Sequence, residues 1–257
     1  MNEIIALNIK QFALIYFLLI IVLFIMKRCK IDRTKLLIVA SLRMTLQLVL
    51  AGLILTYIFN NPHPLFTIMY LMLMNGFAIF TVLQRNKGIN RRFKLIASLS
   101  LSASGICVIC FFIMAVVGVS IFNPQYTIPI SGMIMGNAMT GVSLGLKSFN
   151  DSITSNKNRI NALVNMGVSP KRILTPFVNQ AIETALLPTL NSMLGMGIIS
   201  LPGMMTGQIL SGTMPMTAIF YQIAIVIAIS TVTCLAVFLC LFLGSATLYN
   251  KREQFLI

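Results

Sequence analysis

Long apolar segments separated by short polar connections run along the whole chain. A helix of about 20 apolar residues crosses the hydrocarbon core of a bilayer. The pattern therefore predicts an all-α, polytopic membrane protein with seven transmembrane helices in one domain, residues 1–257. The predicted spans are residues 5–26, 36–59, 65–83, 95–118, 128–146, 182–201 and 217–247.

The composition supports a membrane location. The chain is 58% hydrophobic and 9% charged, whereas about a quarter of the residues of a soluble domain are charged. A cleaved signal peptide does not explain the first apolar segment, because many more such segments follow it. The main partner of the chain is therefore expected to be a lipid bilayer.

The basic residues follow the predicted spans. Seventeen of the 19 Lys and Arg residues lie after spans one, three, five and seven. The other connections, near residues 60–64, 119–127 and 202–216, contain none. Because basic residues in short loops stay cytosolic, the N-terminus is predicted outside and the C-terminus in the cytosol. The net charge of +14 is then a topological signal and does not indicate nucleic-acid binding.

One cytosolic connection, residues 147–181, is long enough to have its own structure. Residues 150–152 are Asn, Asp and Ser, which commonly cap helix N-termini. Gly167 then interrupts the segment, and Ser169-Pro170 is a typical helix start. The pattern predicts a helix, a short turn and a second helix at the cytosolic surface, where a soluble partner can dock.

Residues for acid–base or nucleophilic catalysis are scarce. The only histidine, His63, lies between two prolines in an outer connection. No G-x-x-x-x-G-K-[ST] phosphate-binding motif occurs. The chain is therefore not expected to be an enzyme, and transport is either passive or driven by ATP hydrolysed in another polypeptide. The scattered acidic residues are Glu3, Asp32, Asp151, Glu183 and Glu253.

Polar residues in and beside the spans are candidates for a translocation path. Arg43 and Gln47 share one face of span two. Arg43 either acts in the protein interior or extends toward lipid phosphates. Glu183 lies near the cytosolic edge of span six. The candidate path or gate residues are Arg43, Gln47, Asn137, Thr140, Glu183, Asn191, Ser192, Pro202, Gly203, Met204, Met205, Thr206, Gly207 and Gln208.

The segment SLPGMMTGQILSGTMP, residues 200–215, is uncharged and rich in Gly, Pro and Met. It is either a simple turn or, as we prefer, a broken or re-entrant segment that forms an outer gate. In the second case Thr206 and Gln208 would hydrogen-bond the freed backbone, and Met204 and Met205 would face the path or a partner subunit. Thioethers are either flexible packing groups, the preferred interpretation, or ligands of soft metal ions.

Glycines recur four residues apart at positions 132 and 136, 141 and 145, and 203 and 207. Such pairs allow membrane helices to approach closely. They are expected to pack helices within one subunit, with a subunit interface or a pore lining as the alternatives.

Several strings resemble the FetB-type permeases, the bacterial iron-export ABC family related to plant aluminium-tolerance permeases. The strings are ASLRMTLQLVLAG, IPISGMIMGNAMTGVSLGL, ALVNMGVSPKRI and ALLPTLNSMLGMGIISLPGMMTGQILSG, followed by YQIAI. The resemblance implies a permease in the bacterial cell membrane that pairs with a cytosolic ABC ATPase, two copies of each. ATP and Mg would bind the ATPase, with no cofactor in this chain. Iron or another metal is the implied cargo, with a nucleotide sugar as an alternative.

The same resemblance implies where the ATPase docks. Asn161, Ala162, Leu163 and then Gly167 are similar to the E-A-A-x-x-x-G pattern of ABC permease coupling helices, and Ser169-Pro170 follow. Asn161 departs from the pattern because it replaces an acidic residue, and relatives often have a basic residue where Glu183 stands. Two alternatives remain open: an ATP-independent channel or carrier, and a non-transport role such as a membrane assembly factor.

Overall fold

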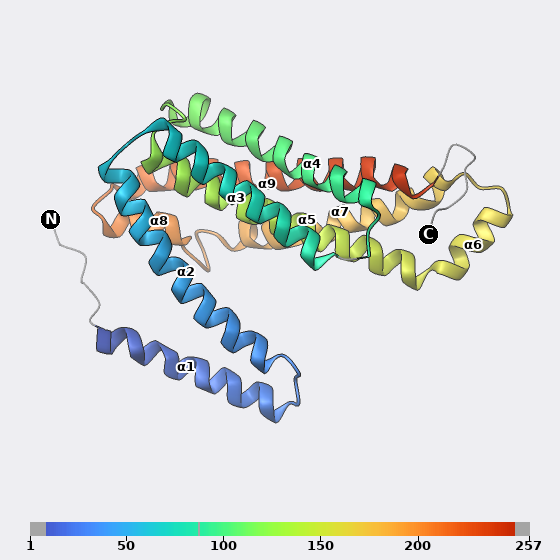
Figure 1. Cartoon of the computed structure of the whole chain (residues 1–257), viewed down its shortest axis with the longest axis horizontal. Helices are drawn as coiled ribbons and strands as arrows, with labels where there is room; N and C mark the ends of the chain where they lie inside the picture. Colours follow the sequence, from blue (N-terminus) through green and yellow to red (C-terminus); the bar gives the residue numbers. More distant parts are fainter. Residues whose placement is uncertain (1–8, 87, 250–257) are drawn as a thin grey trace. The chain divides into compact units, whose positions relative to one another are not determined.

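The computed structural model describes residues 9–86 and 88–249, and long helices dominate this part of the chain (Figure 1). Two units are distinguished. The first consists of residues up to 62 with residues 210–212, and the second of residues 63–209 and those from 213 onward. The elements are α1 (Ile9–Arg28), α2 (Thr34–Asn60), α3 (Pro64–Arg85), α4 (Arg91–Phe111), the π-helical turn η1 (Phe112–Val117), α5 (Pro124–Ser155), α6 (Lys157–Asn165), α7 (Pro170–Gly195), α8 (Gly203–Leu210), α9 (Pro215–Ser245) and the 3-10 turn η2 (Ala246–Leu248).

The first unit is a hairpin of α1 and α2. Lys30 adopts a positive φ of 52° in the connection between them. The hydroxyls of Tyr16 and Thr45 form a hydrogen bond between the two helices. Arg43 and Gln47 lie on the side of α2 opposite to Thr45, because each residue advances about 100° around a helix. The predicted sharing of one face by these two residues follows from the helical geometry of α2.

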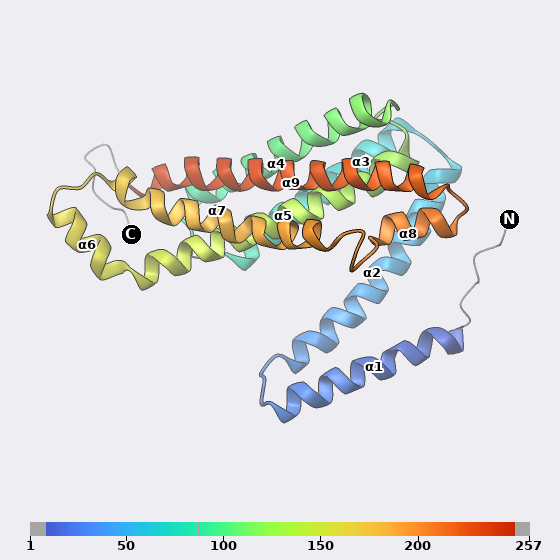
Figure 2. The ribbon, with the colours of Figure 1, turned by 180° about the vertical axis from the view of Figure 1, so that it is seen from behind.

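The second unit is a bundle of α3, α4, α5, α7 and α9. The long helix α9 packs against α4, α5 and α7, which Figure 2 shows from behind. Small residues permit these close contacts. A Cβ placed on Gly244 of α9 would overlap the ring of Phe93 on α4. Phe93 is 2% exposed and also lies against Phe149 of α5, with ring centroids 6.2 Å apart.

Proline marks the start of four helices in this unit: α3, α5, α7 and α9. Its missing N–H is not needed in the first turn, and its fixed φ suits a helix. The His63 Nδ1 atom accepts a hydrogen bond from the Leu65 N–H at 3.2 Å, and Asn123 Oδ1 accepts one from the Gln125 N–H at 3.2 Å. The single histidine therefore caps a helix in the structure.

Two predicted helix boundaries were wrong. Residues 150–152 do not begin the cytosolic helix, because α5 continues without a break to Ser155. Phe149 and Ile153 are buried in the core, so helical apolar spacing persists beyond the predicted span. The predicted start of span five at residue 128 is not a helix start either, since α5 begins at Pro124 and continues through Pro129. The predicted turn at Gly167 and the restart at Pro170 are confirmed.

Each of the seven predicted spans overlaps a long helix in the part of the chain that the structure describes. Four of these satisfy length and apolarity criteria for crossing a membrane: Thr34–Asn60, Pro64–Arg85, Arg91–Val117 and Pro215–Leu248. The crossing of the other three, and the orientation, stay predictions. Residues Glu3, Lys87, Lys251, Arg252 and Glu253 lie outside the described residues.

Candidate functional site

Glycines 141 and 145 bring α5 into close contact with α7 and α9. A Cβ on Gly141 would overlap Thr233 Cγ2 of α9 and stand 3.7 Å from the Ala185 carbonyl oxygen of α7. A Cβ on Gly145 would stand 3.0 Å from Val237 Cγ1. This pair therefore packs helices within one chain. By contrast, a Cβ on Gly136 would have no described atom within 4 Å.

These contacts fix how α5 and α7 are paired. Gly141 lies beside Ala185, and Gly145 lies beside Ala181 and Ala185, so the two helices are antiparallel. The Ser148 hydroxyl donates to Thr184 Oγ1 at 3.2 Å. Ser148 on α5 and Thr184 on α7 lie at the edge of the contact between these two helices. Residues just beyond that edge therefore belong to the same outer surface of the unit.

Polar residues occupy this outer surface. Viewed down the axis of α5, Asn137 is about 20° around the helix from Ser148. Thr140 is about 60° further around, away from the contact with α7. Around α7, Gln180 and Asn191 lie within about 40° of Thr184 on its outer side. Glu183 is about 100° around α7 from Thr184, on the side that faces away from α5. We name these five exposed residues the polar face. Its members are Asn137, Thr140, Gln180, Glu183 and Asn191.

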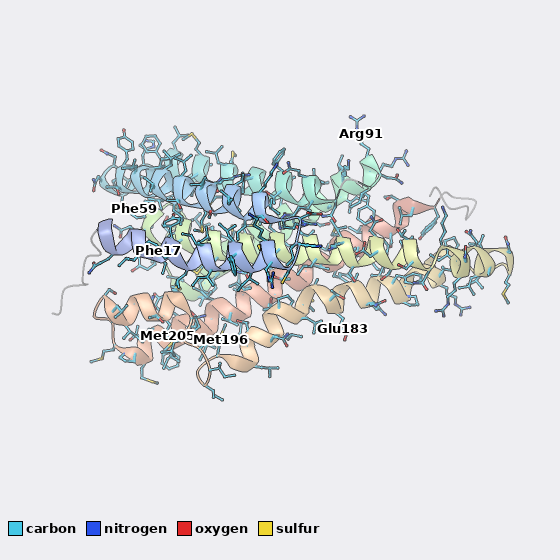
Figure 3. All side chains as sticks on the ribbon, turned by 90° about the horizontal axis from the view of Figure 1, so that it is seen from below. Phe17, Phe59, Arg91, Glu183, Met196 and Met205 are labelled. Atoms are coloured by element: carbon cyan, nitrogen blue, oxygen red, sulfur yellow. The ribbon has the colours of Figure 1, made fainter. Side chains whose placement is uncertain are left out.

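The polar face would be unusual on α5 and α7 if these helices cross the membrane as predicted. Glu183 points outward from α7 in Figure 3. Carboxylates and amides are costly in hydrocarbon and normally face protein or water. Asn137 and Thr140 reduce this cost by donating to their own helix, to the Met133 carbonyl at 2.8 Å and the Gly136 carbonyl at 3.0 Å. Of the predicted set, Asn137, Thr140 and Asn191 therefore lie near the α5–α7 edge, and Glu183 lies further around α7.

Gln180 is not among the residues predicted from the sequence, although it lies one helical turn before Glu183. Ser192 is exposed but lies on a different side of α7 from Asn191. Arg43 and Gln47 belong to the first unit, whereas the polar face belongs to the second.

The segment at residues 200–215 contains a two-turn helix, α8, and is more than a simple turn. Helix α7 ends at Gly195, six residues before the predicted end of span six. Gly197, with φ of 82°, turns the chain, and its N–H donates to the Ser200 carbonyl at 3.0 Å. The Thr206 hydroxyl donates to the Pro202 carbonyl at 3.1 Å, but this carbonyl also accepts the Thr206 N–H at 3.0 Å, so it is not freed backbone and the predicted role of Thr206 stays a prediction.

A cavity of about 540 Å³ lies between α7, α8 and α9. Met205 is buried and lines it, whereas Met204 packs against the hydrophobic core. Met196 and Met205 lie at the same end of the unit, opposite to Arg91 (Figure 3). The Gln222 side-chain oxygen is buried there without a hydrogen-bond partner among the described residues. The lining residues are Met193, Met196, Gly197, Leu201, Pro202, Met205, Ile219, Gln222, Ile223, Val226 and Ile227.

This cavity offers thioethers and one amide, and its other side chains are apolar. In the described part of the chain, no group of three or more His, Cys, Asp or Glu side chains could hold a metal ion. Among the other gate residues, Gly203 and Gly207 are exposed on α8, and the Gln208 carbonyl accepts from the Thr213 N–H at 3.0 Å. The arrangement suits packing or the passage of an ion more than its storage.

The predicted coupling residues form α6 and its C-terminal turn. The Gly167 N–H donates to the Val164 carbonyl at 2.9 Å, and the Val168 N–H to the Leu163 carbonyl at 3.1 Å. This pair of bonds is a Schellman motif, and Gly167 occupies its left-handed position with φ of 78°. A residue other than glycine is strained in this conformation.

Helix α6 has an inner and an outer face. Ile160 is buried, and Leu163 and Val164 pack against the core of the unit. Asn161 and Ala162 are exposed, and Met166 beside them is 77% exposed. The start of α7 fixes the other side of the turn, with Ser169 as N-cap and Pro170 buried. Of the predicted docking residues, Asn161, Ala162 and Gly167 are therefore accessible to a partner.

Comparison with known proteins identifies the family. The model of the Uncharacterised protein family (UPF0014) matches residues 9–249. The chain belongs to the UPF0014 family. It is 31% identical over 239 residues to "UPF0014 membrane protein YjkA" of Bacillus subtilis, covering 91% of this chain and 94% of that protein.

Two further UPF0014 relatives have more informative names. "Probable iron export permease protein FetB" of Escherichia coli is 29% identical over 84% of this chain and 82% of its own length. "Protein ALUMINUM SENSITIVE 3" of Arabidopsis thaliana is 36% identical over 71% of this chain and 66% of its own length. No solved structure matches the chain. The resemblance inferred from the sequence strings is thereby confirmed at the level of the family.

Proposed function

We propose that this chain is the permease subunit of an ABC transporter that exports iron or another metal ion from the cytosol across a bacterial cell membrane. The proposal assigns ATP and Mg to a separate ATPase chain and no cofactor or enzymatic activity to this one. The observation that carries it is the exposed polar face on α5 and α7. Similarity to an Escherichia coli protein named as an iron export permease supports the cargo.

The polar face needs a partner other than lipid. Exposed carboxylate and amide groups on spanning helices are tolerated where they line a water-filled space or contact protein. A second copy of the chain, related by a two-fold axis, would place two such faces opposite each other. We therefore propose a permease homodimer, with the cargo moving between the two polar faces and one ATPase bound to each copy.

The chemistry of this face fits a metal ion that is passed along and not retained. Glu183 supplies a carboxylate, and Asn137, Gln180 and Asn191 supply amide oxygens. Such oxygen donors bind divalent ions more weakly when they are few and spread along a helix than when they form a cage. A weak site is useful in transport because the ion must also leave.

The α6 turn is the proposed docking element for the ATPase. Its inner face is fixed by Ile160 and its outer face presents Asn161, Ala162 and Met166. Lys157 and Arg159 on the same helix are exposed, so a groove with apolar and acidic side chains would be complementary. Movement of the ATPase would reach α5 and α7 directly, because α6 connects them.

The proposed function is tested with inside-out vesicles that contain the chain and a candidate ABC ATPase from the same cell. We expect ATP-dependent accumulation of iron, co-purification of the two proteins and a mass for two copies of each. Iron flux through liposomes that contain this chain alone would contradict the ATP-driven mechanism. ATP-dependent transport of another solute without iron would overturn the assigned cargo.

A double substitution tests the polar face. Asn137→Leu combined with Thr140→Val should lower the transport rate about tenfold, the effect of removing roughly 1.4 kcal/mol of stabilisation of the ion in its path. The matched control is Thr231→Val on α9. Like Thr140, Thr231 is exposed and donates its hydroxyl to the carbonyl four residues earlier, at 2.8 Å. Equal losses of transport rate in the double variant and in Thr231→Val would mean that the polar face is not part of the translocation path.

A further inference from the structure

A second cavity lies at the basic end of the bundle, between α7 and α9. Its volume is about 270 Å³. It shares no residue with the polar face, although its lining residue Asn179 is one helical turn from Glu183 on α7. It is lined by Lys171, Leu174, Thr175, Val178, Asn179, Ile182, Phe238, Phe242, Ser245, Ala246 and Tyr249.

The lining changes from polar to apolar along its length. On α7, Lys171, Thr175, Asn179 and Ile182 follow one another at spacings of three or four residues, so they line one face. On α9, which runs antiparallel to α7, the apolar Phe238 lies at the inner end of the groove. Tyr249, which follows the C-terminal end of α9, lies at the outer end. From Lys171 to Ile182 the helical rise gives a length of about 16 Å.

The polar end is positively charged. Lys171 Nζ lies over the Phe242 ring, 5.9 Å from its centroid. This cation–π contact holds the ammonium group at the mouth of the groove. Tyr249 adds a further hydrogen-bond donor at this end, and none of the described lining residues is acidic. The charge of Lys171 is therefore not neutralised within the lining.

The apolar end suits a hydrocarbon chain. The rings of Phe238 and Phe242 are stacked with centroids 5.3 Å apart and an interplanar angle of 15°. Ile182 and Val178 cover the α7 side of this floor. A soluble anion such as phosphate would not contact these apolar surfaces. A phospholipid has a phosphate followed by an acyl chain, and can contact the charged end and the apolar end together.

We propose that this groove, which we name the headgroup groove, binds an anionic phospholipid. The phosphate lies beside the Lys171 ammonium, with Tyr249 as an additional donor. The glycerol and the first part of an acyl chain lie on Phe242, Phe238 and Ile182. An anionic headgroup is favoured over phosphatidylcholine because the choline cation would lie close to Lys171, and basic groups at a membrane surface attract anionic lipids.

The experiment compares lipids bound to the purified full chain by native mass spectrometry, with thermal unfolding followed by circular dichroism. Phosphatidylglycerol should bind more tightly, and raise the melting temperature more, than phosphatidylcholine. Lys171→Gln should weaken phosphatidylglycerol binding roughly tenfold, as expected for loss of one charge-assisted contact. Lys171→Arg should retain most of it.

The matched control is Arg172→Gln. Arg172 is adjacent, exposed and equally charged, but does not line the groove, so its replacement should leave phosphatidylglycerol binding nearly unchanged. Equal losses in the Lys171→Gln and Arg172→Gln variants would overturn the site, because diffuse surface charge would then explain the binding. Equal stabilisation by glycerol 3-phosphate or by phosphatidylcholine would overturn it as well. An unchanged melting temperature of Lys171→Gln in phosphatidylcholine shows that the variant is folded.

Discussion

Gly167→Val will leave the protein in the membrane but uncouple ATP hydrolysis from transport. Gly167 has φ of 78° and closes the Schellman motif between α6 and α7. A left-handed conformation costs an ordinary L residue about 1–2 kcal/mol, and a β-branched residue is among the least tolerant. A change of this size shifts a conformational equilibrium about 5- to 30-fold. We expect a corresponding loss of ATP-dependent transport in vesicles, with ATPase activity less affected.

The matched variant for this prediction is Gly167→Asn, because asparagine tolerates the left-handed conformation better than other residues. It should retain most of the transport rate. The space around the position does not distinguish the two variants, since a Cβ there would have no described atom within 4 Å. Equal activity of the Val and Asn variants would mean that the backbone of this turn does not transmit the motion of the ATPase.

Much of the fold followed from local features of the sequence. Apolar length placed the long helices, and Ser169-Pro170 placed the start of α7. The end of α5 could not be placed in this way. Residues 150–152 are good N-caps in isolation, but Phe149 and Ile153 are buried against the rest of the unit and keep the helix intact. Tertiary packing therefore overrode a local capping signal.

The candidate site was less accessible to sequence reasoning. The spacing of four identifies glycines 132, 136, 141 and 145 equally, yet only the structure shows that positions 141 and 145 are filled by α7 and α9 and that position 136 is open. Likewise Met204 and Met205 are adjacent in sequence, but one packs on the core and the other lines a cavity. Which side of a helix is covered depends on its neighbours, and these are brought together by residues far apart in the chain.

The contrast between glycines 141 and 136 gives the second large expected effect. Gly141→Val should destabilise the subunit itself, because the added Cβ would overlap Thr233 Cγ2 and the two methyl groups would meet α7 and α9. Overpacking of this kind typically costs about 1–3 kcal/mol. In a chain of this size that lowers the melting temperature by about 2–4 °C for each kcal/mol. Thermal unfolding of the purified Gly141→Val chain measures this drop in melting temperature.

Gly136→Val should behave in the opposite way. No described atom would lie within 4 Å of its Cβ, so the melting temperature of the isolated chain should change little. Gly136 is next to Asn137 of the polar face, however, and the proposed second copy would approach it there. We therefore expect loss of the homodimer in mass measurements and loss of transport, with the subunit still folded. A transport-competent Gly136→Val dimer would exclude this part of α5 from the contact between copies, because two valine side chains cannot occupy the space of two glycines in a close helix crossing.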